Sequence, residues 1–311
     1  MKVLVTGGTG FVGRGVVPAI LDRGHEVYAT LRAESYSNRL DLDRIPNDRL
    51  RVLDIAEPDA WDRAFDVKYD AVVHLVGILK ENPKRGIRHD NVVGEATERV
   101  VKFSKQTGVR KIVYLSAAGT RANAPSRYHQ GKWRAEEAIR GSGLAWTILR
   151  PSVIFGPDDN PDVKKPIEFV TELVRVFRET PMICPVLGPG TNKLQPVWRG
   201  DVATAVVRAL DSPKTESKVF ELGGPKVYTF DECVDLIRAK AGITKKKMHL
   251  PWAIANLVAG SKEKKDPPEI TRDQIVMLRE DNVCDVKPYL DAFPETKLKS
   301  FEDGLKEYTR F

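Results

Sequence analysis

The chain has 311 residues, of which 41% are hydrophobic, and it carries a formal charge of +7. This length and composition predict one large or two modest globular domains with a sizeable core, and no run of about 18 apolar residues offers a transmembrane helix. The scattered Cys184, Cys233 and Cys284 form neither a metal-binding spacing nor a disulfide framework, so we expect a cytoplasmic protein without a bound metal.

The first predicted element is a short apolar strand at Val3–Val5, and because Met1-Lys2 leads directly into it we expect no signal peptide. The strand is followed by Thr6-Gly7-Gly8-Thr9-Gly10-Phe11-Val12-Gly13 and then by the apolar spacing of a helix. In such a turn the first glycine permits the tight bend, the second lets the backbone approach a pyrophosphate, and the third packs the helix on the sheet. The motif predicts a dinucleotide-binding turn, and an empty structural turn is the alternative.

Strands and helices then alternate through the first half of the chain, which is typical of a doubly wound parallel sheet of the Rossmann type in the α/β class. The predicted strands lie at His25–Leu31, Leu50–Asp54, Ala71–Val76, Lys111–Ser116 and Leu144–Leu149. The predicted helices lie at Ile87–Gln106, ending before Gly108, and at Arg127–Arg140, ending before Gly141.

The sequence changes after Arg150-Pro151, where stretches rich in Pro, Gly, Asn and Asp at 156–166 and 181–196 predict turns. A helix at Val202–Leu210 with Asp201 as its N-cap, and a last strand at 220–222, return to the earlier pattern. Helices and loops are predicted from Thr229 onward. We expect residues 1–155, with 196–225 returning to them, to form the dinucleotide-binding domain, and residues 156–311 to form mainly a smaller, irregular substrate-binding region.

Tyr128 and Lys132 lie four residues apart on the predicted helix, so their side chains share one face. An ammonium beside a phenol stabilises the phenolate, which predicts that the pKa of Tyr128 is lowered toward working pH, as a general acid/base requires. Ser116 ends a predicted strand at the sheet edge where ligands bind, and its hydroxyl can hydrogen-bond a substrate carbonyl. A solvated helix face is the alternative interpretation.

With these motifs, and with Asp54-Ile55 and the run Arg150–Gly156 in the same order, the chain resembles the extended and atypical short-chain dehydrogenase/reductases. The resemblance implies that Asp54 and Ile55 flank the adenine of the cofactor. It implies further cofactor contacts from Leu75, Val76, Gly77, Pro151 and Val153, the last two at the nicotinamide end. It also implies four catalytic residues: Ser116 orients the substrate, Tyr128 is the acid/base, Lys132 also holds the nicotinamide ribose, and Asn91 shapes a proton relay.

Within that family, the runs Val73–Leu79, Trp146–Gly156 and Gln195–Val197 are similar to the group that contains the dehydrogenase-like accessory subunit of respiratory complex I. This similarity implies tight NADP(H) binding, in some members without turnover and often without the catalytic tyrosine. Because this chain keeps Ser116 and the Tyr128–Lys132 pair, an active enzyme is favoured over a purely structural subunit.

The end of the second predicted strand, Ala29-Thr30-Leu31-Arg32, lacks the carboxylate that NAD-binding proteins usually place there for the ribose 2′-OH. Arg32 can instead pair with a 2′-phosphate, with Ser35 or Arg39 as a further contact. We therefore expect NADP(H). Glu34 keeps NAD(H) open, and a merely surface-exposed Arg32 is the alternative.

Signals for a substrate site are weaker. Lys80 follows the fourth predicted strand and could border the substrate entrance. Arg199 precedes Asp201 and could reach an anionic substrate group. For both residues the alternative is a solvated position without a role in the site. Trp198 could line either the pocket or the core. We expect His74 to be a histidine with satisfied hydrogen bonds at a strand end rather than a ligand.

The sequence thus predicts an NAD(P)-dependent oxidoreductase or epimerase that transfers a hydride at a carbonyl or hydroxyl carbon of a small molecule or a quinone-type acceptor. The alternative is a non-catalytic NADP(H)-binding accessory or sensor protein. The basic runs Lys245-Lys246-Lys247 and Lys262-Glu263-Lys264-Lys265 are either solvated faces or attract anionic lipid or an anionic partner, and no motif for nucleic acid is present. A homodimer and a peripheral association with a membrane complex stay open.

Overall fold

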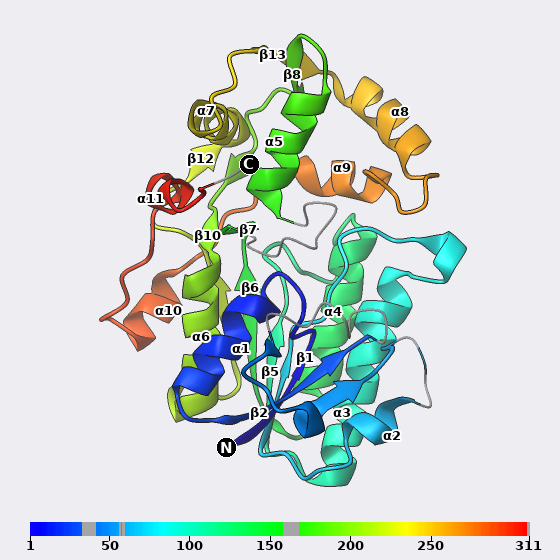
Figure 1. Cartoon of the computed structure of the whole chain (residues 1–311), viewed down its shortest axis with the longest axis vertical. Coiled ribbons are helices and arrows are strands. Elements are labelled where there is room, and N and C mark those ends of the chain that lie inside the picture. Colours follow the sequence, from blue (N-terminus) through cyan, green and yellow to red (C-terminus); the bar gives the residue numbers. More distant parts are fainter. Residues whose placement is uncertain (33–41, 56, 58–59, 158–167, 310–311) are drawn as a thin grey trace. The chain divides into compact units, whose positions relative to one another are not determined.

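The computed structural model describes residues 1–32, 42–55, 57, 60–157 and 168–309, and its main element is a seven-stranded sheet (Figure 1). The strand order is β11-β6-β5-β4-β1-β2-β3, and the pairs from β6 to β3 are parallel. The α/β class and the doubly wound sheet are therefore confirmed. The strands are β1 (Lys2–Thr6), β2 (Glu26–Leu31), β3 (Leu50–Val52), β4 (Ala71–His74), β5 (Lys111–Leu115), β6 (Ala145–Pro151) and β11 (Lys218–Leu222).

Helices cover both faces of this sheet, which is why β4 and β5 are buried along their whole length. One face packs against α2 (Trp61–Ala64), α3 (Ala96–Thr107) and α4 (Arg127–Arg140), whose buried side chains share a core with alternate sheet residues. Away from these helices, Figure 1 shows α1 (Gly13–Asp22) beside α6 (Arg199–Asp211). Arg23 and Asp211 join the ends of α1 and α6 by an ion pair of 2.9 Å.

The helix predicted at Ile87–Gln106 is only partly α-helical. Residues Asp90–Glu95 form a π-helical segment, η6, before α3 begins, and α3 ends at Gly108 with φ 73°, as the glycine predicts. At Gly94 a Cβ would lie 2.9 Å from Cδ of Arg134, so α4 passes very close to the π-helical segment. Hydrophobic spacing does not distinguish an α-helix from this wider turn.

The remaining described residues form a second core with short strand pairs. β8 (Ile183–Leu187) pairs in parallel with β13 (Lys246–Leu250), β9 (Lys193–Leu194) pairs antiparallel with β12 (Tyr228–Thr229), and β7 (Ile154–Phe155) pairs in parallel with β10 (Val197–Trp198). Several of these elements, α5 and α7 among them, share one hydrophobic cluster. The helices are α5 (Phe169–Glu179), α7 (Phe230–Lys240), α8 (Trp252–Lys262), α9 (Arg272–Leu278), α10 (Lys287–Ala292) and α11 (Phe301–Lys306).

The prediction of turns alone at 181–196 is wrong, because β8 and β9 lie there. In β8 the side chains alternate, with Cys184 and Val186 fully buried, so a strand forms although Pro185 and the nearby glycines suggest a turn. β13 was likewise not predicted, because the strand Lys246–Leu250 is exposed or half-buried and has no buried apolar face.

Asp201 is not the N-cap that the sequence predicts. α6 begins two residues earlier, at Arg199, so Asp201 lies in its first turn. Its carboxylate accepts a hydrogen bond of 2.9 Å from the backbone N–H of Lys299, and burial raises its pKa. Asp201 thus binds the backbone of Lys299, 98 residues away in the chain, instead of capping the helix. The local sequence does not reveal this contact.

The chain divides into two compact units. Unit 1 contains Met1–Ile78, Arg85–Arg150 and Val202–Phe220, and unit 2 contains Leu79–Lys84, Pro151–Asp201 and Glu221–Phe311. Each unit is therefore assembled from three separate stretches of sequence. Among the described residues no helix is long and apolar enough to cross a membrane.

Candidate dinucleotide site

The glycine turn connects β1 to α1 at the point where the strand order reverses, with β2 on one side of β1 and β4 on the other. Gly7 adopts φ 79°, in the left-handed region, and the N–H of Gly10 donates to the carbonyl of Gly7 at 3.1 Å. A Cβ at position 13 would lie 2.4 Å from the carbonyl oxygens of both Gly7 and Gly8. Glycine is therefore required where α1 starts.

The start of α1 suits an anionic ligand. No side chain caps the helix, and Gly10 at the tip of the turn is exposed, while Phe11 and Val12 are partly buried. Nη1 of Arg14 donates to the carbonyl of Thr9 at 3.3 Å, which keeps a positive charge at the turn. Main-chain N–H groups, a helix end and a guanidinium together fit a pyrophosphate, so the residues present fit the predicted dinucleotide.

The residues after β4 lie directly beside this turn. The N–H of Leu75 donates to the carbonyl of Thr6 at 3.0 Å, and a Cβ at Gly7 would lie 3.3 Å from the backbone nitrogen of Val76. At Gly77, a Cβ would lie 3.1 Å from Nζ of Lys132. The structure thus places the glycine turn, the end of β4 and the buried Lys132 next to one another within unit 1.

Lys132 is buried on α4 and points at main-chain oxygens. Its Nζ donates to the carbonyl of Leu115 at 2.8 Å and to that of Val76 at 3.3 Å, and it lies 4.8 Å from the centre of the Tyr114 ring. Burial lowers its pKa to about 7, although the nearby Glu136 carboxylate favours the charged form. Lys132 is therefore a group that changes protonation near neutral pH.

Tyr128 lies one turn before Lys132 and is half-buried. Its ring packs edge-on against His89 with centroids 5.6 Å apart and lies 5.2 Å from the ring of His129. Burial raises the pKa of Tyr128 above its ordinary value. The predicted lowering is wrong in this structure, because Nζ of Lys132 lies 6.0 Å from the centre of the phenol ring and donates to carbonyls instead.

Ser116 follows β5 and is buried, as expected for a residue at the strand end. Its Oγ donates to Oε1 of Glu136 at 2.6 Å. Glu136 is fully buried and also accepts from Arg150 at 2.8 Å and 2.7 Å and from Arg140 at 2.6 Å. The Ser116 hydroxyl therefore uses its one proton in a hydrogen bond to a carboxylate. Toward any further group, the oxygen of Ser116 can act only as a hydrogen-bond acceptor.

Glu136 was not predicted as a site residue. Tyr128, Lys132 and Glu136 are spaced four residues apart, so they follow one face of α4, and this spacing was the available signal. A glutamate at such a position is usually solvated, and its burial here is explained by three partners, Arg140 on the same helix and Ser116 and Arg150 from outside it.

Asn91 lies in the π-helical segment before α3. Its Oδ1 accepts from the backbone N–H of Arg88 at 2.9 Å, and its Nδ2 donates to the carbonyl of Gly86 at 2.6 Å. These contacts hold the loop before the segment, and a role in a proton relay stays a prediction.

His74 ends β4 and is fully buried with both ring nitrogens in hydrogen bonds. Thr97 donates its hydroxyl proton to the carbonyl of Val93 at 2.6 Å, so its oxygen accepts from Nε2–H of His74 at 3.1 Å. Nδ1 of His74 then accepts from the hydroxyl of Thr6 at 2.5 Å. Burial lowers the pKa of His74 to about 3, so the ring is neutral and structural, as predicted.

The positions predicted to select the cofactor lie at the carboxyl ends of β2 and β3. Arg32 directly follows β2 and is exposed, Asp54 is exposed, and Ile55 packs against the sheet core. Ser35, Arg39 and Glu34 lie outside the described residues. The adenine and 2′-phosphate contacts stay predictions.

Four predicted contacts belong to unit 2, namely Lys80, Pro151, Val153 and Arg199. The N–H of Val153 donates to Oδ1 of Asn282 at 2.8 Å, and Arg199 opens α6 after Trp198, whose ring packs edge-on against Phe155 at 5.3 Å. Their roles toward cofactor and substrate stay predictions.

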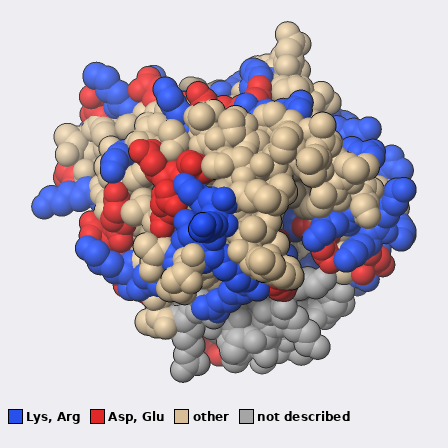
Figure 2. Space-filling model, turned by 90° about the horizontal axis from the view of Figure 1, so that it is seen from above, with Lys and Arg blue, Asp and Glu red and all other residues tan. Residues whose placement is uncertain are grey.

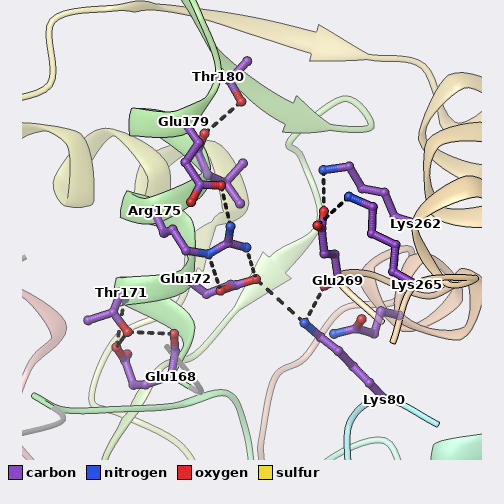
Figure 3. Close-up of polar contacts among 12 residues, drawn as sticks. Lys80, Glu168, Thr171, Glu172, Arg175, Glu179, Thr180, Lys262, Lys265 and Glu269 are labelled. Carbon is purple, nitrogen blue, oxygen red and sulfur yellow. Dashed lines mark hydrogen bonds and ion pairs between the residues drawn. The ribbon is translucent and has the colours of Figure 1, made fainter. Parts of the chain in front are cut away.

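Lys80 takes part in a polar network of unit 2 (Figure 3). Its Nζ donates to the carbonyl of Glu269 at 2.5 Å and lies 3.8 Å from the carboxylate of Glu172.

Comparisons with known proteins identify the family of the chain. The model of the NAD dependent epimerase/dehydratase family matches residues 3–223. The mitochondrial NADH dehydrogenase (ubiquinone) 1 alpha subcomplex subunit 9 of Arabidopsis thaliana is 28% identical over 266 residues, which are 83% of this chain and 62% of the relative. Eugenol synthase 2 of Clarkia breweri is 23% identical over 265 residues, 80% of this chain and 78% of the relative.

A solved structure, UDP-glucose 4-epimerase of Thermotoga maritima, superposes with a TM-score of 0.70 at 20% identity and covers 99% of this chain and 97% of that chain. The predicted resemblance to extended short-chain dehydrogenases and to the complex I accessory subunits is confirmed. The chain spans about three fifths of the length of the first curated relatives.

Proposed function

Since the chain belongs to the NAD dependent epimerase/dehydratase family, we propose that it binds NADP(H) on the glycine turn and acts as an oxidoreductase or epimerase. The observation that carries the proposal is that the glycine turn, Val76-Gly77 and Lys132 are neighbours in unit 1, because this places an ionisable amine close to a helix start that suits phosphate. Arg32 after β2, where a carboxylate would favour NAD, supports NADP(H) over NAD(H).

The protonation states favour Tyr128 as a proton donor. Burial keeps the phenol protonated at neutral pH, so Tyr128 can give its proton to a substrate oxygen that gains negative charge. A bound nicotinamide supplies the hydride. Lys132 holds the ribose and, with a pKa of about 7, can return a proton to the site between turnovers.

Ser116 has a narrower role than the family resemblance implies. Because its proton is donated to Glu136, Ser116 orients a substrate hydroxyl by accepting from it, rather than by donating to a carbonyl.

The test begins with mass spectrometry of the nucleotide that copurifies with the chain, followed by carbonyl, quinone and sugar-nucleotide substrates with that cofactor. Tyr128→Phe should lower turnover about 100-fold or more and leave cofactor affinity nearly unchanged, because it removes only the donated proton. Tyr28→Phe is the matched control, since its hydroxyl donates to Glu26 at 3.0 Å on β2. Unchanged turnover of Tyr128→Phe would exclude this mechanism.

A second candidate is a non-catalytic NADP(H)-binding accessory protein that associates with a membrane complex from its surface. The hydrogen bond from Ser116 to Glu136 supports this candidate, because the Ser116 proton is then not available to a substrate carbonyl. The similarity to subunits of complex I supports it as well. It predicts a tightly held nucleotide that reacts with none of the substrates and a stable partner in pull-down experiments. Turnover that depends on Tyr128 would exclude it.

A further inference from the structure

The helix α8 in unit 2 carries apolar side chains on its outer face. Ile254, Leu257 and Val258 are 47%, 75% and 39% exposed and follow the i, i+3, i+4 spacing of one helix stripe. The opposite face is already covered, since Ala255 and Ala259 are fully buried in a small core with Ile275 of α9. A surface helix normally has polar residues on its outer face, so this stripe requires an explanation.

The C-terminal end of α8 is surrounded by lysines. Nζ of Lys84 donates to the carbonyl of Lys264 at 2.7 Å, which places these two residues side by side. Lys262 and Lys265 both contact Glu269, at 3.0 Å and 2.7 Å, and lower its pKa to about 2 (Figure 3). Lys264 is exposed and forms no ion pair within the described part of the chain.

The local charge is strongly positive. Residues 244–272 contain seven Lys or Arg against three Asp or Glu, which accounts for four of the seven net positive charges of the chain. Figure 2, which views the end of the molecule where Figure 1 places α8, shows a broad uncharged area whose border carries Lys and Arg together with some Asp and Glu. A stripe of this kind beside basic residues complements a surface that is apolar inside and anionic outside.

We propose that α8 docks the protein on an anionic lipid membrane, with Ile254, Leu257 and Val258 at the level of the upper acyl chains and Lys84, Lys264 and Lys265 among the headgroup phosphates. Lysine suits this position because its long stem lies along apolar surface while its ammonium reaches the phosphates. An apolar helix stripe with lysines at its end matches the arrangement of helices that lie in a lipid interface, and this favours a lipid surface over a protein partner.

The full chain is sedimented with vesicles of phosphatidylcholine alone and with vesicles in which about one third of the lipid is phosphatidylglycerol. We expect at least roughly tenfold more binding to the anionic vesicles at low salt, and a large loss at high salt. Leu257→Gln with Val258→Ser should lower binding to the anionic vesicles about tenfold. The triple variant K84Q, K264Q and K265Q should abolish the preference for phosphatidylglycerol.

Two control variants test whether the weaker vesicle binding comes from loss of docking through α8 and not from a general change in charge or stability. Val227 is 39% exposed, as Val258 is, and Val227→Ser should bind like the wild type. The triple variant K68Q, K105Q and K193Q removes the same charge from other exposed positions and should keep the lipid preference. Equal binding to both kinds of vesicle, or α8 variants that bind like the wild type, would overturn the proposal. Capture of a protein partner through α8 without vesicle binding would overturn it as well.

Discussion

Lys132 is a buried amine whose folded-state pKa, about 7, lies below its ordinary value of 10.5. Between these values the unfolded chain binds the proton and the folded chain does not, so stability rises with pH through this window; below it both states bind the proton, and the contribution of this group no longer changes with pH. From pH 7 to pH 9.5 the wild type should gain about 3 kcal/mol from this group, read from urea unfolding midpoints.

Lys132→Met keeps most of the side-chain volume and should remove this pH dependence while lowering stability through its lost hydrogen bonds. Lys105→Met, at an exposed position on α3, should keep the wild-type slope. A Lys132→Met variant with the same slope as the wild type would show that the buried amine does not titrate here.

Arg32 provides the clearest prediction about cofactor choice. Arg32→Ala should raise the Kd for NADP(H) about 10- to 100-fold, because a hydrogen-bonded charge pair with a phosphate contributes about 1.5–3 kcal/mol. The Kd for NAD(H), which has no 2′-phosphate, should change by less than about twofold. Isothermal titration calorimetry measures both, with the exposed Arg63→Ala on α2 as the control. Equal losses for the two cofactors would remove Arg32 from the 2′-phosphate site.

At the scale of elements, the start of α1 depends on Gly13. Gly13→Ala places a Cβ 2.4 Å from two carbonyl oxygens, so either the turn or the helix must move. We expect a loss of about 1–3 kcal/mol in the free energy of unfolding and at least about 100-fold weaker dinucleotide binding. Gly141→Ala, at the end of α4 with φ −78° and its nearest contact at 3.3 Å, should be nearly neutral in both measurements. Wild-type binding by Gly13→Ala would disprove the role of the turn.

The elements that the sequence predicts well are those whose pattern is local. Neighbouring residues determine each of these features, which are the apolar runs of β1 and β4, the glycine turn and the end of α3 before Gly108. The contacts that were missed join distant positions: Ser116 with Glu136, and Asp201 with Lys299. The π-helical segment was missed for another reason, since its hydrophobic spacing resembles that of an α-helix.

At the scale of the whole molecule, the proposed cofactor should stabilise the fold by mass action. At a free NADPH concentration of about 100 Kd, binding adds about 2.7 kcal/mol, which corresponds to a rise in Tm of about 4 °C for a chain of 311 residues that unfolds as one unit. Differential scanning calorimetry with increasing NADPH should show a continuing, concentration-dependent rise, and Gly13→Ala should show a rise several times smaller at the same NADPH concentration. A Tm independent of NADPH would contradict binding to the native state.

The division of unit 1 into three stretches affects how the protein is made. β6 ends at Pro151, but its neighbour β11 begins only at Lys218, and residues 202–220 also supply most of α6. During translation the edge of β6 therefore emerges from the ribosome well before the strand that covers it. A pause between these two segments would leave a hydrogen-bonding edge open to pairing with other nascent chains.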